Sequence, residues 1–423
     1  MPASSRIINR WWQLAACMIA MVAIANLQYT WTLFTIPLSQ GLHVKLSDVQ
    51  LAFTLFIVAQ SWLVPILGYL VDRFGARIVV GVGGVLVGVS WVGSGTAQSI
   101  SALYFWYLIG GVGAGGVYGA CVGVILKWFP DVRGLATGLV VGAYGSGAAL
   151  TVIPIQRMIE RSGYSATFIT WGVIQGIVVT MLARFMVAPA STWKPGGEQM
   201  APPVGGQVHR SVVSYTPLQM LRTGTFYVMY IASTLITFGG LVVTAQLKPI
   251  AAAYELDKAE AFLGVTALGL ALMFNLILSG LARPFWGWLS DRIGRYNTMG
   301  MAFALGALAI LAMVELMGRP MWFVILSGMT VFAWGATFVL FSAAIGDVFG
   351  SEYAAANNGV VYTSKGVASI FSGWGAARLL EMTGSWLPVF WVAFGCNLVA
   401  AVLALFCLRP MVAKLTRRER TPL

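Results

Sequence analysis

The sequence predicts an all-α polytopic membrane protein with twelve transmembrane helices arranged as two six-helix halves. Three observations lead to this fold class. Hydrophobic residues make up 58% of the 423 residues and charged residues only 9%, which is far from the composition of a soluble globular chain. Apolar spans recur along the whole chain, and segments of the first half are repeated in the second. We therefore expect the chain to have the lipid bilayer as its main partner.

Each predicted helix is an apolar span between polar residues, because about 20 apolar residues are needed to cross a hydrocarbon core about 30 Å thick. The first half contains the spans 13–36, 48–71, 77–97, 101–126, 134–156 and 165–188. The second half contains the spans 223–248, 261–288, 297–316, 320–346, 354–378 and 385–408. The basic N-terminus followed by an apolar run imitates a signal peptide, but the apolar run continues, so we predict an uncleaved first helix.

A Pro- and Gly-rich polar segment separates the sixth span from the seventh and is typical of a linker. The predicted organisation is an N-terminal six-helix bundle at 1–188, a cytoplasmic linker at 189–222 and a C-terminal six-helix bundle at 223–423.

The charge distribution predicts the orientation. The net charge is +12, but the Lys and Arg residues form no basic patch interleaved with aromatics, so we expect no nucleic-acid partner. They cluster between the spans, and those at the two termini, the linker and the loops on the same side outnumber those on the other side. By the positive-inside rule, both termini are cytoplasmic. We expect a multi-pass protein of the plasma (inner) membrane.

The two halves repeat at a nearly constant offset. The segment Gly68–Arg77, GYLVDRFGAR, matches GWLSDRIGRY, which begins at Gly287, at an offset of 219. The pair Tyr144-Gly145 matches Lys365-Gly366 at an offset of 221. Such a repeat indicates duplicated bundles with a central site at their interface, which is the architecture of a secondary transporter.

These motifs resemble the major facilitator superfamily and, more closely, its oxalate:formate antiporter family. The general signature is the G-x-x-x-D-R-x-G-x-R loop, and the closer one comprises QYTWTLF, GVYGA, RPFWGWLSDRIGRY and SKGVASIFSG. The resemblance covers nearly the whole chain and implies the major facilitator fold. We expect a monomer with no cofactor and no metal ion. We expect no enzyme activity, because no nucleophile and base pair or metal-ligand cluster is present in the sequence.

Two cations stand inside predicted spans, and no carboxylate does. Arg283 precedes Asp291 by eight positions, which places it roughly 12 Å inside the end of its helix. Lys365 is about eleven residues into its span, roughly 16 Å deep. A cation at such a depth costs on the order of 2.5–3.5 kcal/mol and usually faces a partner or a wet cavity. The missing partner is either a small anionic substrate or the carbonyl groups of a helix break.

The family resemblance favours the substrate, because Arg283 and Lys365 match the two intramembrane cations that bind it. The resemblance also implies an aromatic and amide cage around the anion, formed by Gln28, Tyr29, Trp31, Gln60, Tyr118, Tyr144 and Trp334. Flat rings exclude water, while hydroxyl, indole and amide groups donate to carboxylate oxygens. Phe34 and Phe338 stand where oxalate carriers of the family have tyrosines, which weakens the case for oxalate itself.

The D-R-x-G-x-R loops predict gating charge pairs at the cytoplasmic side. The candidate gating residues are Asp72, Arg73, Arg77, Arg133, Asp291, Arg292 and Arg295. A solvated turn that only obeys the positive-inside rule is the alternative.

Three functions are compatible with the sequence. We predict an exchanger of small carboxylates. Such an exchanger needs no titratable carboxylate or histidine in the membrane, and the predicted spans contain none. A proton-coupled monocarboxylate symporter is the alternative, although lactate and pyruvate carriers have an aspartate one turn before the arginine, where this chain has Ser279. A non-transporting receptor or sensor of the same fold is the third function; a long cytoplasmic output domain would favour it, and we expect none from the sequence.

Overall fold

A computed structural model describes residues 9–129, 133–187, 189, 214–262, 264–350 and 353–420. The helices of the first half are α1 (Arg10–Tyr29), α2 (Trp31–Leu42), α3 (Leu46–Trp62), α4 (Val64–Phe74), α5 (Ala76–Gly95), α6 (Ile100–Trp128), α7 (Arg133–Ser146), the 3-10 turn η1 (Gly147–Leu150) and α8 (Val152–Ala183). Lipid offers no hydrogen-bond partner to a backbone, so these apolar segments satisfy their own amides and carbonyls as helices.

The second half begins with the short helix α9 (Pro217–Leu221). It continues with α10 (Gly224–Ala253), the strands β1 (Glu260–Phe262) and β2 (Val265–Thr266), α11 (Ala267–Ile293), α12 (Arg295–Leu316), α13 (Pro320–Phe349), α14 (Ala354–Tyr362), α15 (Ser364–Ser369), the π-helical turn η2 (Ile370–Gly375), α16 (Ala376–Thr383), α17 (Leu387–Val402), the π-helical turn η3 (Leu403–Leu408) and α18 (Arg409–Arg420). Most of the predicted linker, 190–213, lies outside the described residues.

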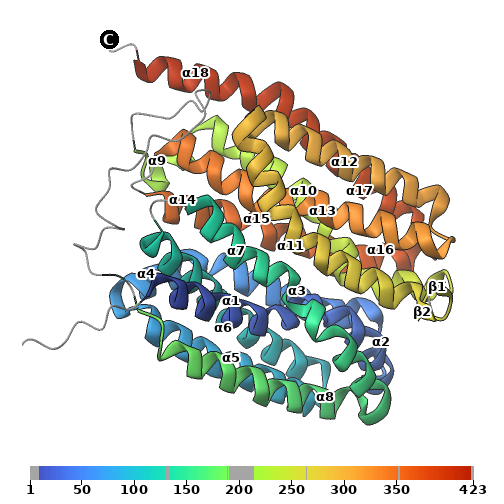
Figure 1. The fold of residues 1–423 in the computed structure, drawn as a ribbon. Helices are drawn as coiled ribbons and strands as arrows, with labels where there is room; N and C mark the ends of the chain where they lie inside the picture. Colours follow the sequence, from blue (N-terminus) through green and yellow to red (C-terminus); the bar gives the residue numbers. More distant parts are fainter. Residues whose placement is uncertain are drawn as a thin grey trace, which may run out of the picture.

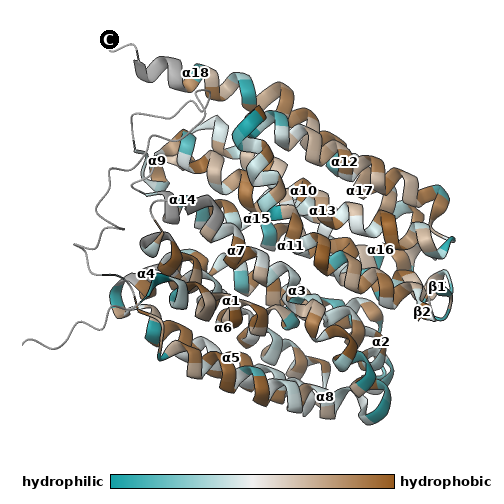
Figure 2. Cartoon of the chain, in the orientation of Figure 1, coloured by the Kyte–Doolittle hydropathy of each residue, from teal (hydrophilic) through white to brown (hydrophobic). Residues whose placement is uncertain are grey.

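The helices run side by side in two groups, α1 to α8 and α10 to α18 (Figure 1). We call the end of the bundle that carries α9 the α9 end, and the end that carries β1 and β2 the hairpin end (Figure 1). Apolar residues predominate in the helices along the length of the bundle (Figure 2). The chain is thus a multi-pass, all-α membrane protein.

Most of each predicted span lies on helix, but several bounds differ. Within the described residues, nine segments are long and apolar enough to cross a membrane. One of them, Ala136–Ala183, joins the fifth and sixth predicted spans across Gly163, whose φ of 79° is not helical. The predicted spans 48–71 and 354–378 are absent from the nine because α3 ends at Trp62 and α14 ends at Tyr362. The count of twelve therefore remains a prediction.

The predicted span 261–288 began too early. The strands β1 and β2 pair as an antiparallel hairpin, and α11 starts only at Ala267. Thr266 accepts a hydrogen bond from the amide of Gly269 and caps the helix. The helix then continues to Ile293, five residues beyond the predicted end.

The sequence repeat has a structural counterpart at the turns of the D-R-x-G loops. Gly75 has φ 84° between α4 and α5, and Gly294 has φ 89° between α11 and α12. The two glycines are 219 residues apart, the same offset as the sequence motif. Residues with a side chain avoid positive φ, so both halves need glycine for the same turn.

Small residues bring the helices within each half close together. A Cβ added to Gly113 of α6 would lie 2.8 Å from the carbonyl oxygen of Gly83 in α5. A Cβ added to Gly88 of α5 would lie 3.0 Å from the Cα of Gly176 in α8. Helices in lipid gain attraction from such close backbone packing.

Candidate functional site

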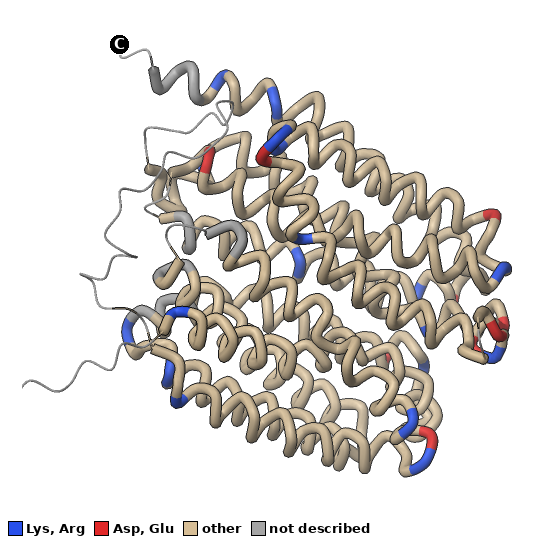
Figure 3. The backbone as a smooth tube through the Cα atoms, in the orientation of Figure 1, with Lys and Arg blue, Asp and Glu red and all other residues tan. Residues whose placement is uncertain are grey.

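Charged residues gather at the two ends of the bundle, and blue Lys or Arg segments also appear in its middle (Figure 3). Among the Lys and Arg residues whose side chains are described, two are buried: Arg283, 1% exposed, and Lys365, 2% exposed. Both belong to the second half, Arg283 to α11 and Lys365 to α15. Neither forms an ion pair with a carboxylate among the described residues.

The break between α14 and α15 positions Lys365. The Trp62 indole of α3 donates to the carbonyl of Thr363, 2.9 Å away, and the Tyr230 hydroxyl of α10 contacts the Thr363 hydroxyl at 3.0 Å. These two contacts satisfy the carbonyl and the hydroxyl of Thr363, the residue that follows the end of α14. Lys365 follows the break by two residues, so its direction is fixed by contacts from both halves.

Lys365 donates across the interface between the halves. Its Nζ lies 2.8 Å from Oε1 of Gln28 and 2.7 Å from Oε1 of Gln60, which belong to α1 and α3. Gln60 donates in turn to the Tyr144 hydroxyl at 2.7 Å, and that hydroxyl donates to Gln28 at 2.9 Å. The four side chains form a closed ring of hydrogen bonds in which only Lys365 carries a formal charge.

Arg283 is held less completely. Its Nη1 donates to the carbonyl of Ser279 at 2.7 Å and contacts the Ser279 hydroxyl at 3.3 Å, one turn earlier on α11. Its Nη2 has a long contact of 3.4 Å with the Tyr29 hydroxyl of α1. Its Nε is buried without a partner among the described residues.

Aromatic rings surround both cations. The Phe338 ring of α13 lies 5.4 Å from the guanidinium carbon of Arg283 and 5.9 Å from Nζ of Lys365, so the same apolar ring adjoins both charges. The Tyr362 ring lies 5.4 Å from Nζ of Lys365 and stacks on Tyr118 at 5.5 Å. Rings in these positions exclude water and favour cations through their π faces.

Three N–H groups of described residues at the site lack a hydrogen-bond partner. Among the described residues, Nε of Arg283, Nε2 of Gln28 and Nε1 of Trp334 are buried and have no acceptor. Trp334 belongs to the site because its ring lies 5.3 Å from that of Phe338. A buried donor without an acceptor costs about 1–3 kcal/mol, so the three atoms together favour a ligand that supplies acceptors.

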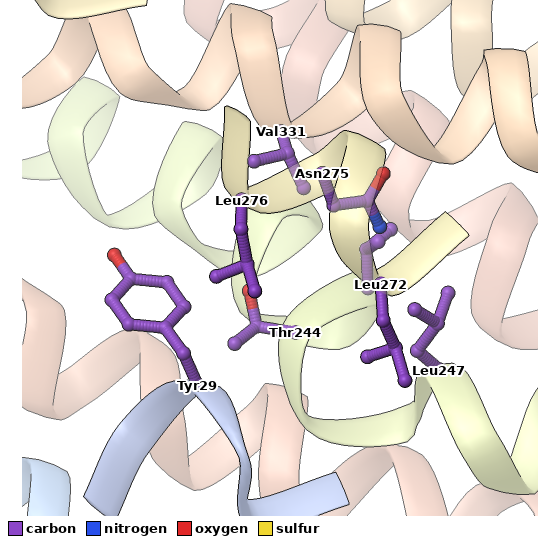
Figure 4. Close-up of a pocket in the computed structure, with 8 residues that line it drawn as sticks. Tyr29, Thr244, Leu247, Leu272, Asn275, Leu276 and Val331 are labelled. Carbon is purple, nitrogen blue, oxygen red and sulfur yellow. The ribbon is translucent and has the colours of Figure 1, made fainter. Parts of the chain in front are cut away.

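Two small cavities adjoin the site, one on each side of it along the bundle. The first, on the hairpin side, is shown in Figure 4 and is lined by Tyr29, Val243, Thr244, Leu247, Leu272, Asn275, Leu276 and Val331. The second, on the α9 side, is lined by Lys365 and residues of the second half that include Thr337 and Phe338. Each has a volume of about 20 Å³, room for about one water molecule. The structure is therefore closed around the cations.

The predicted cage is brought together in part. Gln28, Gln60 and Tyr144 contact Lys365 or its hydrogen-bonded ring, and Tyr29 contacts Arg283. Tyr118 and Trp334 reach the site through ring contacts with Tyr362, Tyr144 and Phe338.

Trp31 does not lie against either cation. Its indole donates to Gln50 at 3.0 Å, and its ring packs against Phe53 and Tyr107. Phe34, whose missing hydroxyl counted against oxalate, is also away from the cations, stacked on Phe168 at 4.0 Å in the first half. Only Phe338 of the two phenylalanine departures is at the site.

The gating candidates divide between the halves. In the second half, Arg295 binds Asp291 at 2.6 Å and Asp347 at 3.1 Å and thereby ties α12 to α11 and α13, whereas Arg292 lies over the Trp288 ring at 4.3 Å. In the first half, Arg73 lies 5.5 Å from the Phe74 ring and Arg77 is exposed. The side chains of Asp72 and Arg133 lie outside the described part of the structure. The ion pairs of Arg295 join helices of one half, so they do not by themselves link the two halves.

Two residues that touch the cations, Ser279 and Tyr362, were not among the predicted substrate-binding residues. Ser279 is four residues before Arg283, and Tyr362 is three residues before Lys365. Ser279 and Arg283 are one turn apart on α11, so their spacing was an available signal, whereas Tyr362 and Lys365 lie on opposite sides of the break between α14 and α15. Within the described residues, His, Cys, Asp and Glu form no group of three that could hold a metal ion.

Comparison with known proteins agrees with this architecture. The Major Facilitator Superfamily family model matches residues 16–279 and 236–422. The oxalate:formate antiporter of Oxalobacter formigenes is 34% identical over 405 residues, which covers 95% of this chain and 92% of that protein. Monocarboxylate transporter 11 of Mus musculus is 26% identical over 357 residues, 83% of this chain and 73% of that protein.

Among solved structures, the crystal structure of a point mutant of the nucleoside transporter NupG aligns with a TM-score of 0.67 at 13% identity. The alignment covers 95% of this chain and 99% of that chain, so the two proteins share the fold. The family model and the similarity to the oxalate:formate antiporter indicate that the chain is a transporter and not an enzyme. The chain belongs to the major facilitator superfamily and, within it, is similar to the oxalate:formate antiporter.

Proposed function

We propose that this transporter exchanges one small carboxylate for another by alternating access. The observation that carries the proposal is the pair of buried cations, Arg283 and Lys365, with no carboxylate partner among the described residues. The unpaired donors of Arg283, Gln28 and Trp334 add to it, because a carboxylate supplies the acceptors that they need. The likeness to the oxalate:formate antiporter supports the same class of substrate.

The two cations suit different parts of the task. The planar guanidinium of Arg283 can hold a carboxylate with two parallel hydrogen bonds, whereas the ammonium of Lys365 supplies a compact charge. In the closed structure the amide oxygens of Gln28 and Gln60 occupy Lys365. A substrate carboxylate replaces these oxygens at Lys365 and frees the two amides to turn their N–H groups toward it.

The charges also give a reason for exchange. Without a substrate, Arg283 and Lys365 repel each other, and only amide, hydroxyl and carbonyl dipoles offset this repulsion. A bound anion neutralises the pair, so the loaded carrier changes its conformation more easily than the empty one while the halves rock around the site. Transport in one direction is thereby tied to transport in the other.

The orientation belongs to the same proposal. The basic residues of the sequence are concentrated at the termini, in the linker and at the turns of the α9 end, so this end faces the cytoplasm. The hairpin end then faces the outside.

Proton-coupled symport of a monocarboxylate is the second candidate, supported by the likeness to Monocarboxylate transporter 11. Ser279 argues against it, because the residue one turn before Arg283 is a hydroxyl that binds the arginine and not a carboxylic acid that could carry a proton.

Counterflow in proteoliposomes tests the proposal. Vesicles loaded with one carboxylate are diluted into labelled oxalate, formate, lactate, pyruvate, malonate or succinate, with and without a protonophore. We expect uptake that needs an internal carboxylate and that the protonophore leaves unchanged. Uptake that collapses with the proton gradient would replace exchange by symport. Arg283→Gln should abolish uptake, while Arg319→Gln, which removes an exposed arginine at the start of α13, should not.

A further inference from the structure

The guanidinium of Arg283 lies against the backbone of α7 at Gly145, across the interface between the halves. A Cβ added to Gly145 would overlap Nη1 of Arg283 and would lie 2.5 Å from its Cζ and 2.8 Å from the hydroxyl of Ser279. Real Cβ atoms essentially never approach other heavy atoms below 3.0 Å. Any residue other than glycine at position 145 is therefore incompatible with the observed place of the guanidinium.

The space between α7 and α11 differs on the two sides of this point. A Cβ added to Gly280 of α11 would lie 2.7 Å from the Cβ of Ser146, whereas one added to Gly142 of α7 would have its nearest contact, the carbonyl oxygen of Gly280, at 3.5 Å. The space at Gly142 is thus ordinary, and the restriction on α7 is local to Gly145. Arg283 is buried and cannot move into solvent to avoid an added methyl group.

The internal repeat places a glycine with a related task in the other half. Gly366 follows Lys365 as Gly145 follows Tyr144, at an offset of 221. A Cβ added to Gly366 would lie 2.6 Å from Cδ1 of Trp62 and 2.7 Å from Oγ of Ser61, both in α3 of the first half. In each half, the glycine after a site residue admits a side chain from the opposite half.

We propose that Gly145 is a positioning residue for Arg283: its lack of a side chain allows the guanidinium to seat against α7 between Ser279 and Tyr29. The consequence for transport rests on the proposed function, in which Arg283 holds the carboxylate, but the seating itself does not. A methyl group at position 145 displaces the guanidinium from the other donors of the site, and recognition sites lose affinity when a binding group moves by about 1 Å.

The experiment compares Gly145→Ala with Gly142→Ala, the matched change one turn earlier on α7. We expect Gly145→Ala to raise the KM for carboxylate counterflow at least tenfold and to lower the thermal midpoint of the purified protein. Gly142→Ala should leave both within the scatter of the native protein. Equal effects of the two variants, or no effect of Gly145→Ala, would overturn the proposal.

A double-mutant cycle with Arg283→Lys separates seating from helix packing. Lysine lacks the Cζ and Nη1 atoms that a Cβ at position 145 would meet, and only the contact with the Ser279 hydroxyl remains, so Gly145→Ala should cost less than threefold in KM when added to Arg283→Lys, against at least tenfold in the native background. Gly145→Ala should lower the thermal midpoint less in the Arg283→Lys background than in the native protein. Additive losses would show that position 145 serves only helix packing.

Thermal midpoints and folded yield distinguish the seating of Arg283 at Gly145 from the proposed carboxylate exchange. If Gly145→Ala alone does not fold, recovery of folded protein in the Arg283→Lys background supports the seating, and failure to recover refutes it. If Arg283 proves dispensable for carboxylate exchange, the proposed function fails while the thermal midpoints of the cycle still report on the contact.

Discussion

Replacing Arg283 by lysine separates the charge of this residue from its shape. Lysine keeps one positive charge but has no planar fork, so it cannot hold a carboxylate with two parallel hydrogen bonds. In the structure, Nη1 of the guanidinium donates to Ser279 and Nη2 makes a long contact with Tyr29. Its Nε has no hydrogen-bond partner among the described residues. The guanidinium therefore has an N–H group available for the anion, whereas the ammonium of a lysine has no N–H group fixed at that position.

The expected loss is one hydrogen bond to a charged group, about 1.5–3 kcal/mol. With about 1.4 kcal/mol per factor of ten, this corresponds to a roughly 10- to 150-fold weaker binding of the carboxylate. Arg283→Gln removes the charge as well and should abolish exchange. The assay is equilibrium binding of labelled carboxylate to purified protein, combined with initial counterflow rates and the yield of folded protein.

Arg319→Lys is the control, because Arg319 is exposed at the start of α13 and lies outside the site. Two results would refute the reasoning. A well-folded Arg283→Gln protein that exchanges carboxylates at the native rate would show that the cation does not hold the substrate. Variants that lose folding, but bind normally in the fraction that folds, would show that Arg283 serves only the carbonyl of Ser279.

Three further predictions concern other parts of the interface. Lys365→Arg should bind carboxylate more tightly than Lys365→Gln in the same binding assay, because this position mainly needs a charge; equal losses would contradict that. Phe338→Tyr should raise the preference for oxalate over formate in competitive counterflow, because it adds a donor beside both cations, and an unchanged ratio would place the ring outside the substrate's reach. Gln50→Leu should destabilise the closed hairpin end by about 1–3 kcal/mol, because Gln50 binds Trp31, Ala245 and Gln246 and its loss leaves their buried groups unpaired; faster labelling of a cysteine introduced at Thr54 would report the opening, and an unaltered rate would count against it.

The sequence already located the elements that hold the fold. Composition and span length follow directly from the solvent, because the cost of an unsatisfied backbone in lipid leaves few alternatives to helices. The repeat of the D-R-x-G loops is visible in the letters and returns as the two positive-φ glycines, Gly75 and Gly294. Arg283 and Lys365 could be singled out for the same reason, since a cation is conspicuous in an apolar span.

The details of the site depended on how the helices pack. Trp31 and Phe34 are in the same first span as Gln28 and Tyr29, yet the break after Tyr29 and the packing of α2 direct them toward Gln50 and Phe168. Residue type alone cannot distinguish these directions, because an aromatic side chain serves equally in a cage and in a helix contact.

The sequence by itself determined that this protein is a helical membrane transporter with two cations and no carboxylate inside its predicted spans. Only the tertiary structure decided which groups share the space around them. The contacts of Lys365 with Gln28 and Gln60 and of Arg283 with Gly145 join residues more than 130 positions apart in the chain and cross between the halves. No local periodicity encodes such a pairing, because it depends on the register and the distance at which two separately folded bundles meet.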